Sequence, residues 1–149
     1  MEKITLSVIK ANVGGFVGHT DMHEDVLQKA GGWLAKASSK EMLIDSWTAR
    51  CGDDLALMMT HEKGVEHKDI HKLAWETFTA CAEVAEKLHL YSPAQDLLSE
   101  SFNGTLRGLG PGVAEIAFRE RPCESFIIFL ADKCELGAWN LPLYKMFAD

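Results

Sequence analysis

The amino-acid sequence predicts one α+β domain over residues 1–149, a layered domain with two main helices packed on a largely antiparallel β-sheet. Segments 24–36 and 66–90 carry apolar residues at about every third or fourth position, the spacing of an amphipathic helix. Five short apolar runs, rich in β-branched and large side chains, are typical of strands. Their order along the chain, β-α-β-β-α-β-β, indicates helices layered on a sheet.

The first predicted strand, residues 4–9, leads into a glycine-rich loop. This loop, residues 11–21, contains three glycines, which mark backbone angles that other residues rarely adopt. Residues 24–36 then form the first helix, although Gly31 and Gly32 lower its helical propensity.

A hairpin and the longest helix are predicted next. Two apolar runs, residues 42–51 and 55–60, flank Gly52-Asp53-Asp54, and a glycine followed by two acids between such runs indicates a hairpin turn. Residues 66–90 form the second helix, which has one apolar face for the core.

The last third of the chain is predicted to contain a loop and two strands. Residues 101–112 are rich in glycine but match neither the P-loop nor the dinucleotide-binding motif. Backbone amides in such a loop can approach a phosphate closely, although glycine-rich loops are usually only loops. Strands over 113–118 and 126–131 complete the predicted sheet.

The composition argues against several classes of function. A formal net charge of −7 disfavours a nucleic-acid-binding surface, which is normally basic, and suits carboxylates that hold divalent cations. No apolar window approaches the roughly 18 residues that cross a bilayer, and the first residues lack the apolar core of a signal peptide. Four cysteines without a zinc-binding spacing indicate reduced thiols. We therefore expect a cytoplasmic protein that binds neither nucleic acid nor membrane.

Four side chains are candidates for a functional site. Asp53 and Asp54 can converge on one hard cation such as Mg²⁺, or they can form an ordinary solvated turn. Asp132 follows the apolar run 126–131, where it is either held rigidly for a site or marks the exit of the strand into solvent. His19, in the glycine loop, can bind a metal or a phosphate, or can simply be exposed.

Two histidines on the second predicted helix have a spacing that can place two imidazoles on one metal. These residues, His67 and His71, are four positions apart, but no third ligand is evident nearby and the H-E-x-x-H motif is absent. The spacing alone therefore does not favour a metal site.

Blocks along almost the whole chain match one protein family in collinear order. The matching blocks are Thr5–Ala11, Val13-Gly14, Gly18–Thr20, Gly52–Asp54, Met59–His61, Tyr91, Gln95–Leu98, Gly108–Glu115, Ala131–Lys133 and Gly137–Asp149. The chain thereby resembles the amino-terminal part of the archaeal-type (class V) fructose-1,6-bisphosphate aldolase/phosphatases. This family joins dihydroxyacetone phosphate to glyceraldehyde 3-phosphate and then removes the 1-phosphate of fructose 1,6-bisphosphate, in gluconeogenesis.

The resemblance implies a homo-oligomer that uses two or more Mg²⁺ ions, and it assigns roles by position. The implied metal ligands are His19, Asp53, Asp54, Gln95 and Asp132. The implied substrate contacts are His19, Tyr91, Asn103, Gly104 and Lys133, the last of which counters phosphate charge.

Two departures from the family pattern qualify these expectations. Asn12 stands where the family has an aspartate that ligates metal and accepts a proton during phosphate hydrolysis, and an amide cannot accept a proton at neutral pH. The chain also ends at Asp149, before the region that holds the family's Schiff-base lysine. We therefore expect a shortened and impaired enzyme. The alternative is a non-catalytic domain that binds metal or sugar phosphate, or an assembly partner.

Overall fold

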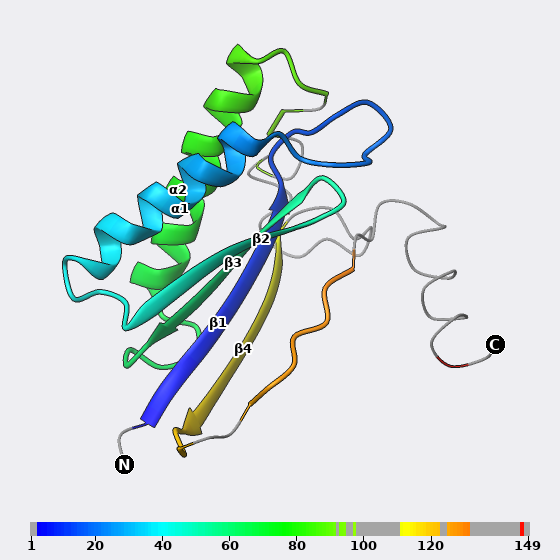
Figure 1. Cartoon of the computed structure of the whole chain (residues 1–149). Coiled ribbons are helices and arrows are strands. Elements are labelled where there is room, and N and C mark those ends of the chain that lie inside the picture. The colour runs from blue at the N-terminus through cyan, green and yellow to red at the C-terminus, as the bar shows by residue number, and fades with distance from the viewer. Residues whose placement is uncertain are drawn as a thin grey trace.

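The fold is a two-layer α+β arrangement, in which two helices cover one face of a four-stranded sheet (Figure 1). The computed structural model describes residues 3–91, 93–94, 97, 111–122, 125–131 and 147. Strand order is β2-β3-β1-β4, and every pairing between neighbouring strands of this sheet is antiparallel. The predicted fold class is therefore confirmed. The elements are β1 (Lys3–Asn12), α1 (Glu24–Ser38), β2 (Asp45–Cys51), β3 (Asp54–His61), α2 (Lys68–Lys87) and β4 (Gly112–Arg119).

Both helices begin at a histidine that acts as an N-cap. The Nδ1 atom of His23 accepts a hydrogen bond from the backbone N–H of Asp25 (3.1 Å) at the start of α1. His67 does the same for Asp69 (3.3 Å) at the start of α2. A cap satisfies one of the backbone donors that a helix start leaves without an intrahelical partner. His67 therefore has a local role in the fold, which its spacing from His71 did not indicate.

The core lies between the helices and one face of the sheet. Along each strand, alternate residues point to this face, because the side chains of a strand alternate between its two sides. The largest fully buried apolar side chains come from both layers and include Ile9, Leu34, Leu55, Leu57, Met59, Ile70 and Phe78. Burial of this apolar surface is the main favourable contribution to folding.

The register of the sheet brings two distant segments together at one end. Asn12, the last residue of β1, lies opposite Asp54, the first residue of β3. The loop that follows β1 therefore meets the hairpin turn at residues 52–53, which joins β2 to β3 and in which Gly52 has a φ of 59°. A left-handed conformation of this kind favours glycine, so the predicted hairpin turn is confirmed.

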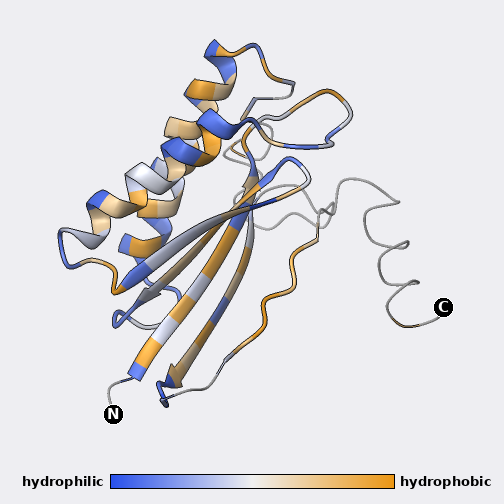
Figure 2. Ribbon diagram, in the orientation of Figure 1, coloured by the Kyte–Doolittle hydropathy of each residue, from blue (hydrophilic) through white to orange (hydrophobic). Residues whose placement is uncertain are grey.

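The prediction of a strand over residues 126–131 is wrong. This segment runs beside β4 without forming a strand, and it is hydrophobic over most of its length (Figures 1 and 2). A groove of about 700 Å³ lies between it and the side chains of β1 and β4, among them Leu6 and Ile116. Strands pair only when their backbones lie about 5 Å apart. The run has a high β-propensity, but the groove keeps its backbone too far from the edge strand β4 for the two to pair.

Two further observations follow from the fold. Within the described residues, no helix is both long enough and apolar enough to cross a membrane.

Cys81 is buried on α2, where desolvation raises the pKa of its thiol to about 12 and its Sγ contacts the backbone oxygen of Val26 (3.6 Å). A protonated, buried thiol is unreactive. The other two cysteines of the second half, Cys123 and Cys134, lie outside the described residues.

Substitution of Gly32 by alanine is expected to stabilise the protein by about 0.5–1 kcal/mol. Gly32 is exposed within α1, and nothing lies within 4 Å of where a Cβ atom would be. Thermal unfolding measures the change. Gly64→Ala is the control, because Gly64 also has open space but a φ of +87°, so that substitution should destabilise the fold. Equal effects of the two substitutions would contradict the account of α1.

Candidate functional site

Two aspartates at the hairpin turn are buried rather than solvated. The exposed fraction is 0% for Asp53 and 2% for Asp54. Buried carboxylates are costly unless charges or hydrogen-bond donors surround them. An ordinary solvated turn, which the sequence left open, therefore does not describe these two residues.

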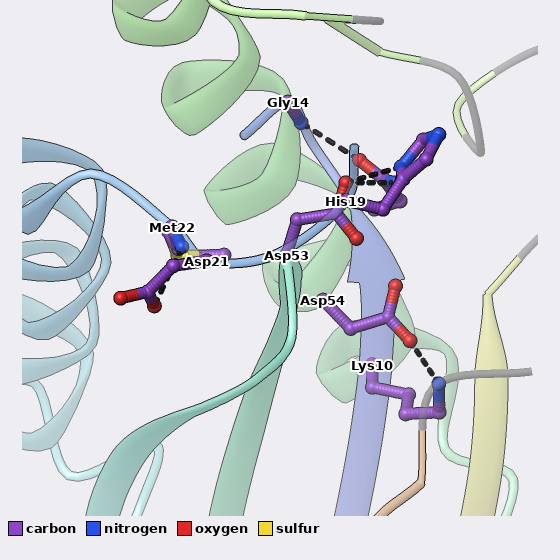
Figure 3. Close-up of polar contacts among 8 residues, drawn as sticks. Lys10, Gly14, His19, Asp21, Met22, Asp53 and Asp54 are labelled. Carbon is purple, nitrogen blue, oxygen red and sulfur yellow. Dashed lines mark hydrogen bonds and ion pairs between the residues drawn. The ribbon is translucent and has the colours of Figure 1, made fainter. Parts of the chain in front are cut away.

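Asp53 is held by two side chains that come from β1 and from the loop after it. Its Oδ2 atom accepts a hydrogen bond from Asn12 Nδ2 (2.9 Å) and lies 2.5 Å from Nδ1 of His19 (Figure 3). We assign the proton to His19 Nδ1, because a carboxylate can only accept. Both donors reach the same oxygen, which explains the 3.3 Å approach between Asn12 Nδ2 and His19 Nδ1.

The amide of Asn12 is fixed in one orientation. Its Oδ1 atom accepts a hydrogen bond from the backbone N–H of Gly14 (3.0 Å), so its Nδ2 atom must face Asp53. The side chain is fully buried, and a reversed amide would place two donors or two acceptors against each other at both contacts. Asn12 therefore presents N–H groups, and not its carbonyl oxygen, to the carboxylate of Asp53.

The glycine loop packs its backbone directly on Asp53. A Cβ atom on Gly15 would lie 2.4 Å from Cβ of Asp53 and 2.7 Å from the carbonyl oxygen of Asp21, so only glycine fits here. Gly15 also exchanges two backbone hydrogen bonds with Tyr91 (3.2 and 2.8 Å). This bridge places the Tyr91 ring edge-on to the ring of His19, with 5.1 Å between the centroids. The loop thus positions His19, Tyr91 and Asp53 together.

Asp54 is paired with a lysine on the neighbouring strand. Lys10 Nζ donates to Asp54 Oδ2, and the two side chains point toward one another at the edge of the site (Figure 3). Asp21, in contrast, points away from the site and forms an ion pair with Arg50 (3.4 Å). Sequence reasoning did not single out Lys10, and the only signal for it was a cation within a β-strand otherwise rich in apolar residues.

The structure brings together four of the site residues that the sequence predicted, namely Asn12, His19, Asp53 and Asp54, with Tyr91 beside His19. The other predicted site residues, Gln95, Asn103, Gly104, Asp132 and Lys133, lie outside the described residues. Within the described part of the chain, no group of three or more His, Cys, Asp or Glu side chains is arranged to hold a metal ion.

A second buried polar cluster joins three strands to the start of α2. His61 Nε2 is 2.9 Å from Ser7 Oγ, and Ser7 Oγ donates to Glu115 Oε1 (2.6 Å). Because His61 Nδ1 accepts from the backbone N–H of Lys63 (3.2 Å), the ring proton is on Nε2 and is donated to Ser7. Ser7 therefore cannot pass a proton to His61, so this cluster is not a nucleophile with its base.

Glu115 accepts hydrogen bonds from two other directions as well. His71 Nε2 lies 3.1 Å from Oε1, and the backbone N–H of Glu66 donates to Oε2 (2.6 Å). The cluster thus links the edge strand β4 to α2 and to the segment that precedes it. His71, like His67, has a structural partner, which accounts for its position without a metal.

The pKa values in this cluster shift in directions that make the protein sensitive to acid. Burial lowers the pKa of His61, although the charge of Glu115 opposes this effect. Burial alone would raise the pKa of Glu115, but the hydrogen bonds from Ser7, Glu66 and His71 outweigh it and lower that pKa. In both cases the unfolded chain takes up the proton at a higher pH than the folded chain does.

The free energy of unfolding is therefore expected to decrease as the pH falls below about 6.5, where unfolded histidine becomes protonated, and again below about 4.5 as Glu115 titrates. Urea unfolding between pH 8 and 4 measures this dependence. His61→Gln should flatten the decrease between pH 6.5 and 5, whereas a control substitution of the exposed His89 by Asn should retain it. Identical pH profiles for the two variants would contradict the assignment to His61.

Comparisons with known proteins agree with the resemblance of the sequence. A family model described as "Fructose-1,6-bisphosphatase" matches residues 3–149. Curated proteins named fructose-1,6-bisphosphate aldolase/phosphatase are similar over 99% of this chain: the protein of Moorella thermoacetica is 56% identical, that of Ignicoccus hospitalis 53% and that of Pyrobaculum neutrophilum 51%. The chain spans 38%, 38% and 37% of the length of these three relatives. The chain belongs to the fructose-1,6-bisphosphate aldolase/phosphatase family.

Proposed function

We propose that this chain carries a Mg²⁺-binding part of an active site for fructose 1,6-bisphosphate. The observation that carries the proposal is that Asp53, which is buried at one end of the sheet, contacts Asn12 and His19, and that the buried Asp54 lies next to it, opposite Asn12. The relatives are named for aldolase and phosphatase activity on this sugar bisphosphate, which supports the choice of substrate.

The chemistry of the donor set fits a hard divalent cation. Buried carboxylates supply the oxygen ligands that Mg²⁺ prefers, and Asp53 is seated so tightly against Gly15 that its carboxylate has little freedom to move. His19 would contribute Nε2, because its Nδ1 donates to Asp53, an arrangement typical of histidine ligands. The metal ligands would be His19, Asp53 and Asp54, completed by Gln95 and Asp132, around two or more Mg²⁺ ions.

When bound, Mg²⁺ would polarise a phosphoryl oxygen and lower the pKa of a coordinated water. The residues of the chain would orient the substrate. Tyr91, next to His19, would contact the sugar, and Asn103 and Gly104 would line its path. Lys133 would counter the charge of a phosphate, as lysines do at many phosphate sites.

The orientation of Asn12 supports a second candidate function. A group at this position that accepts a proton would have to present an oxygen toward the reacting water, but the oxygen of Asn12 is bonded to Gly14 and its N–H groups face Asp53. An amide also has no basicity at neutral pH. This arrangement favours a non-catalytic domain that binds metal or sugar phosphate, or a phosphatase with a strongly reduced rate.

Calorimetry of the 149-residue chain with Mg²⁺, followed by an assay of phosphate release from fructose 1,6-bisphosphate, tests the proposal. Wild-type protein is expected to bind Mg²⁺, and Asp53→Asn to bind it at least tenfold more weakly. Asp25→Asn is the matched control, because it makes the same chemical change at an exposed residue in the first turn of α1. Absence of Mg²⁺ binding by the wild type would contradict the metal site. Binding without phosphate release would favour the non-catalytic domain.

A further inference from the structure

Lys10 is an internal cation within the proposed metal site. It lies on β1 two residues before Asn12, so both side chains are on the same face of the sheet. Its Nζ atom donates to Asp54 Oδ2, and the side chains are only 15% and 2% exposed. The ammonium group therefore stands at the carboxylate where a divalent cation would bind.

The strands around Lys10 hold its side chain in this position. Gly112 of β4 lies directly opposite Lys10, and a Cβ atom on Gly112 would approach Lys10 Cγ to 3.4 Å and Cε to 3.7 Å. Gly112 therefore lies beside the aliphatic stem of Lys10. Lysines more often extend their charge into water, so a lysine directed along the sheet to a buried aspartate is an uncommon arrangement.

A lysine ammonium and a divalent cation cannot share one carboxylate at low cost, since like charges a few ångströms apart repel strongly in a partly buried site. We propose that Lys10 is the built-in counter-cation of Asp54, which neutralises that carboxylate without metal and must be displaced when a divalent cation binds. This inference rests on the proposed Mg²⁺ site and assigns a residue that sets its affinity. Lys10 thus stabilises the metal-free chain and weakens metal binding.

Lys10→Met tests this role, because methionine has a similar length but no charge. Without Mg²⁺, the melting temperature of the variant is expected to fall by several degrees, since Asp54 loses its ion pair. In calorimetry, its affinity for Mg²⁺ and for Mn²⁺ is expected to rise at least tenfold over wild type, and Mg²⁺ should raise its melting temperature further than that of wild type.

Two control variants separate the charge of Lys10 from general effects. Lys72→Met removes an exposed charge that forms an ion pair with Glu76 on α2 (3.8 Å), and it should leave both the melting temperature and the metal affinity unchanged. Lys10→Arg keeps the positive charge and should retain weak metal binding. If Lys10→Met does not fold in the absence of metal, Mg²⁺ should restore the helical signal in its circular dichroism spectrum. Recovery of that signal supports the inference, and no recovery overturns it.

The outcomes distinguish this inference from the proposed function. Mg²⁺ binding by wild type together with equal or weaker binding by Lys10→Met overturns the role of Lys10 and leaves the metal site intact. An unchanged melting temperature of metal-free Lys10→Met also overturns it. Failure of both proteins to bind Mg²⁺ or Mn²⁺ removes the proposed metal site, and the role of Lys10 with it.

Discussion

Asn12→Asp is expected to increase Mg²⁺-dependent phosphate release from fructose 1,6-bisphosphate by about 10²–10⁴-fold, the usual contribution of a general base. The reason is that an aspartate at this position can accept a proton from an attacking water, whereas the amide of Asn12 donates to Asp53 and accepts from Gly14. A malachite green assay at saturating Mg²⁺ measures the rate with the full chain.

The same substitution should have a second consequence without metal. An aspartate at residue 12 would bring a second carboxylate to the position where Asn12 Nδ2 now lies 2.9 Å from Asp53 Oδ2, so the melting temperature should fall in EDTA and recover with Mg²⁺. Gln28→Glu, the matched change of an amide to an acid on the exposed surface of α1, should alter neither quantity. If Asn12→Asp releases no more phosphate than wild type, Asn12 is not what limits the reaction.

Glu115→Ala is expected to lower the free energy of unfolding by about 2–4 kcal/mol, because it leaves the buried hydroxyl of Ser7 and the backbone N–H of Glu66 without their acceptor. Urea unfolding at pH 7.5 measures the loss. Glu115→Gln retains an oxygen and should cost less. The control is Glu120→Ala, because Glu120 is exposed directly after the end of β4. This substitution should change the free energy of unfolding by no more than about 0.5 kcal/mol.

A loss below about 1 kcal/mol for Glu115→Ala would show that the buried cluster contributes little to holding β4 against α2. A loss of equal size for Glu120→Ala would instead indicate a general effect of removing negative charge. The two results are distinguishable because Glu115 accepts hydrogen bonds from the buried Ser7, from His71 and from the backbone N–H of Glu66, whereas Glu120 is exposed.

The elements with regular periodicity could be predicted from the sequence, because local spacing determines them. The helices over 24–36 and 66–90 and the hairpin at Gly52 match α1, α2 and the β2–β3 turn closely. The run 126–131 could not be judged in this way. Its composition favours a strand, but a strand also needs a partner, and a groove separates this run from the edge strand β4.

Candidate residues for the site could be proposed from the sequence, but their geometry could not be predicted from it. Asp53 and Asp54 stood out in the sequence as an adjacent pair, but the sequence does not show that both are buried or that Gly15 of another loop packs on Asp53. Their partners Asn12, His19 and Lys10 are between 34 and 44 residues away in the sequence. The Ser7–Glu115 contact joins residues 108 positions apart, and no local pattern in the sequence indicates such a pair. Long-range contacts of this kind arise only from the assembled sheet.

The most direct test of the account is a crystal of the full chain soaked with Mn²⁺ and fructose 1,6-bisphosphate and measured at the manganese absorption edge. The account predicts an anomalous peak within about 2.0–2.3 Å of carboxylate oxygens of both Asp53 and Asp54, with Lys10 moved away from Asp54. A fully soaked crystal in which Lys10 still binds Asp54, and in which no anomalous peak lies near either aspartate, would contradict it.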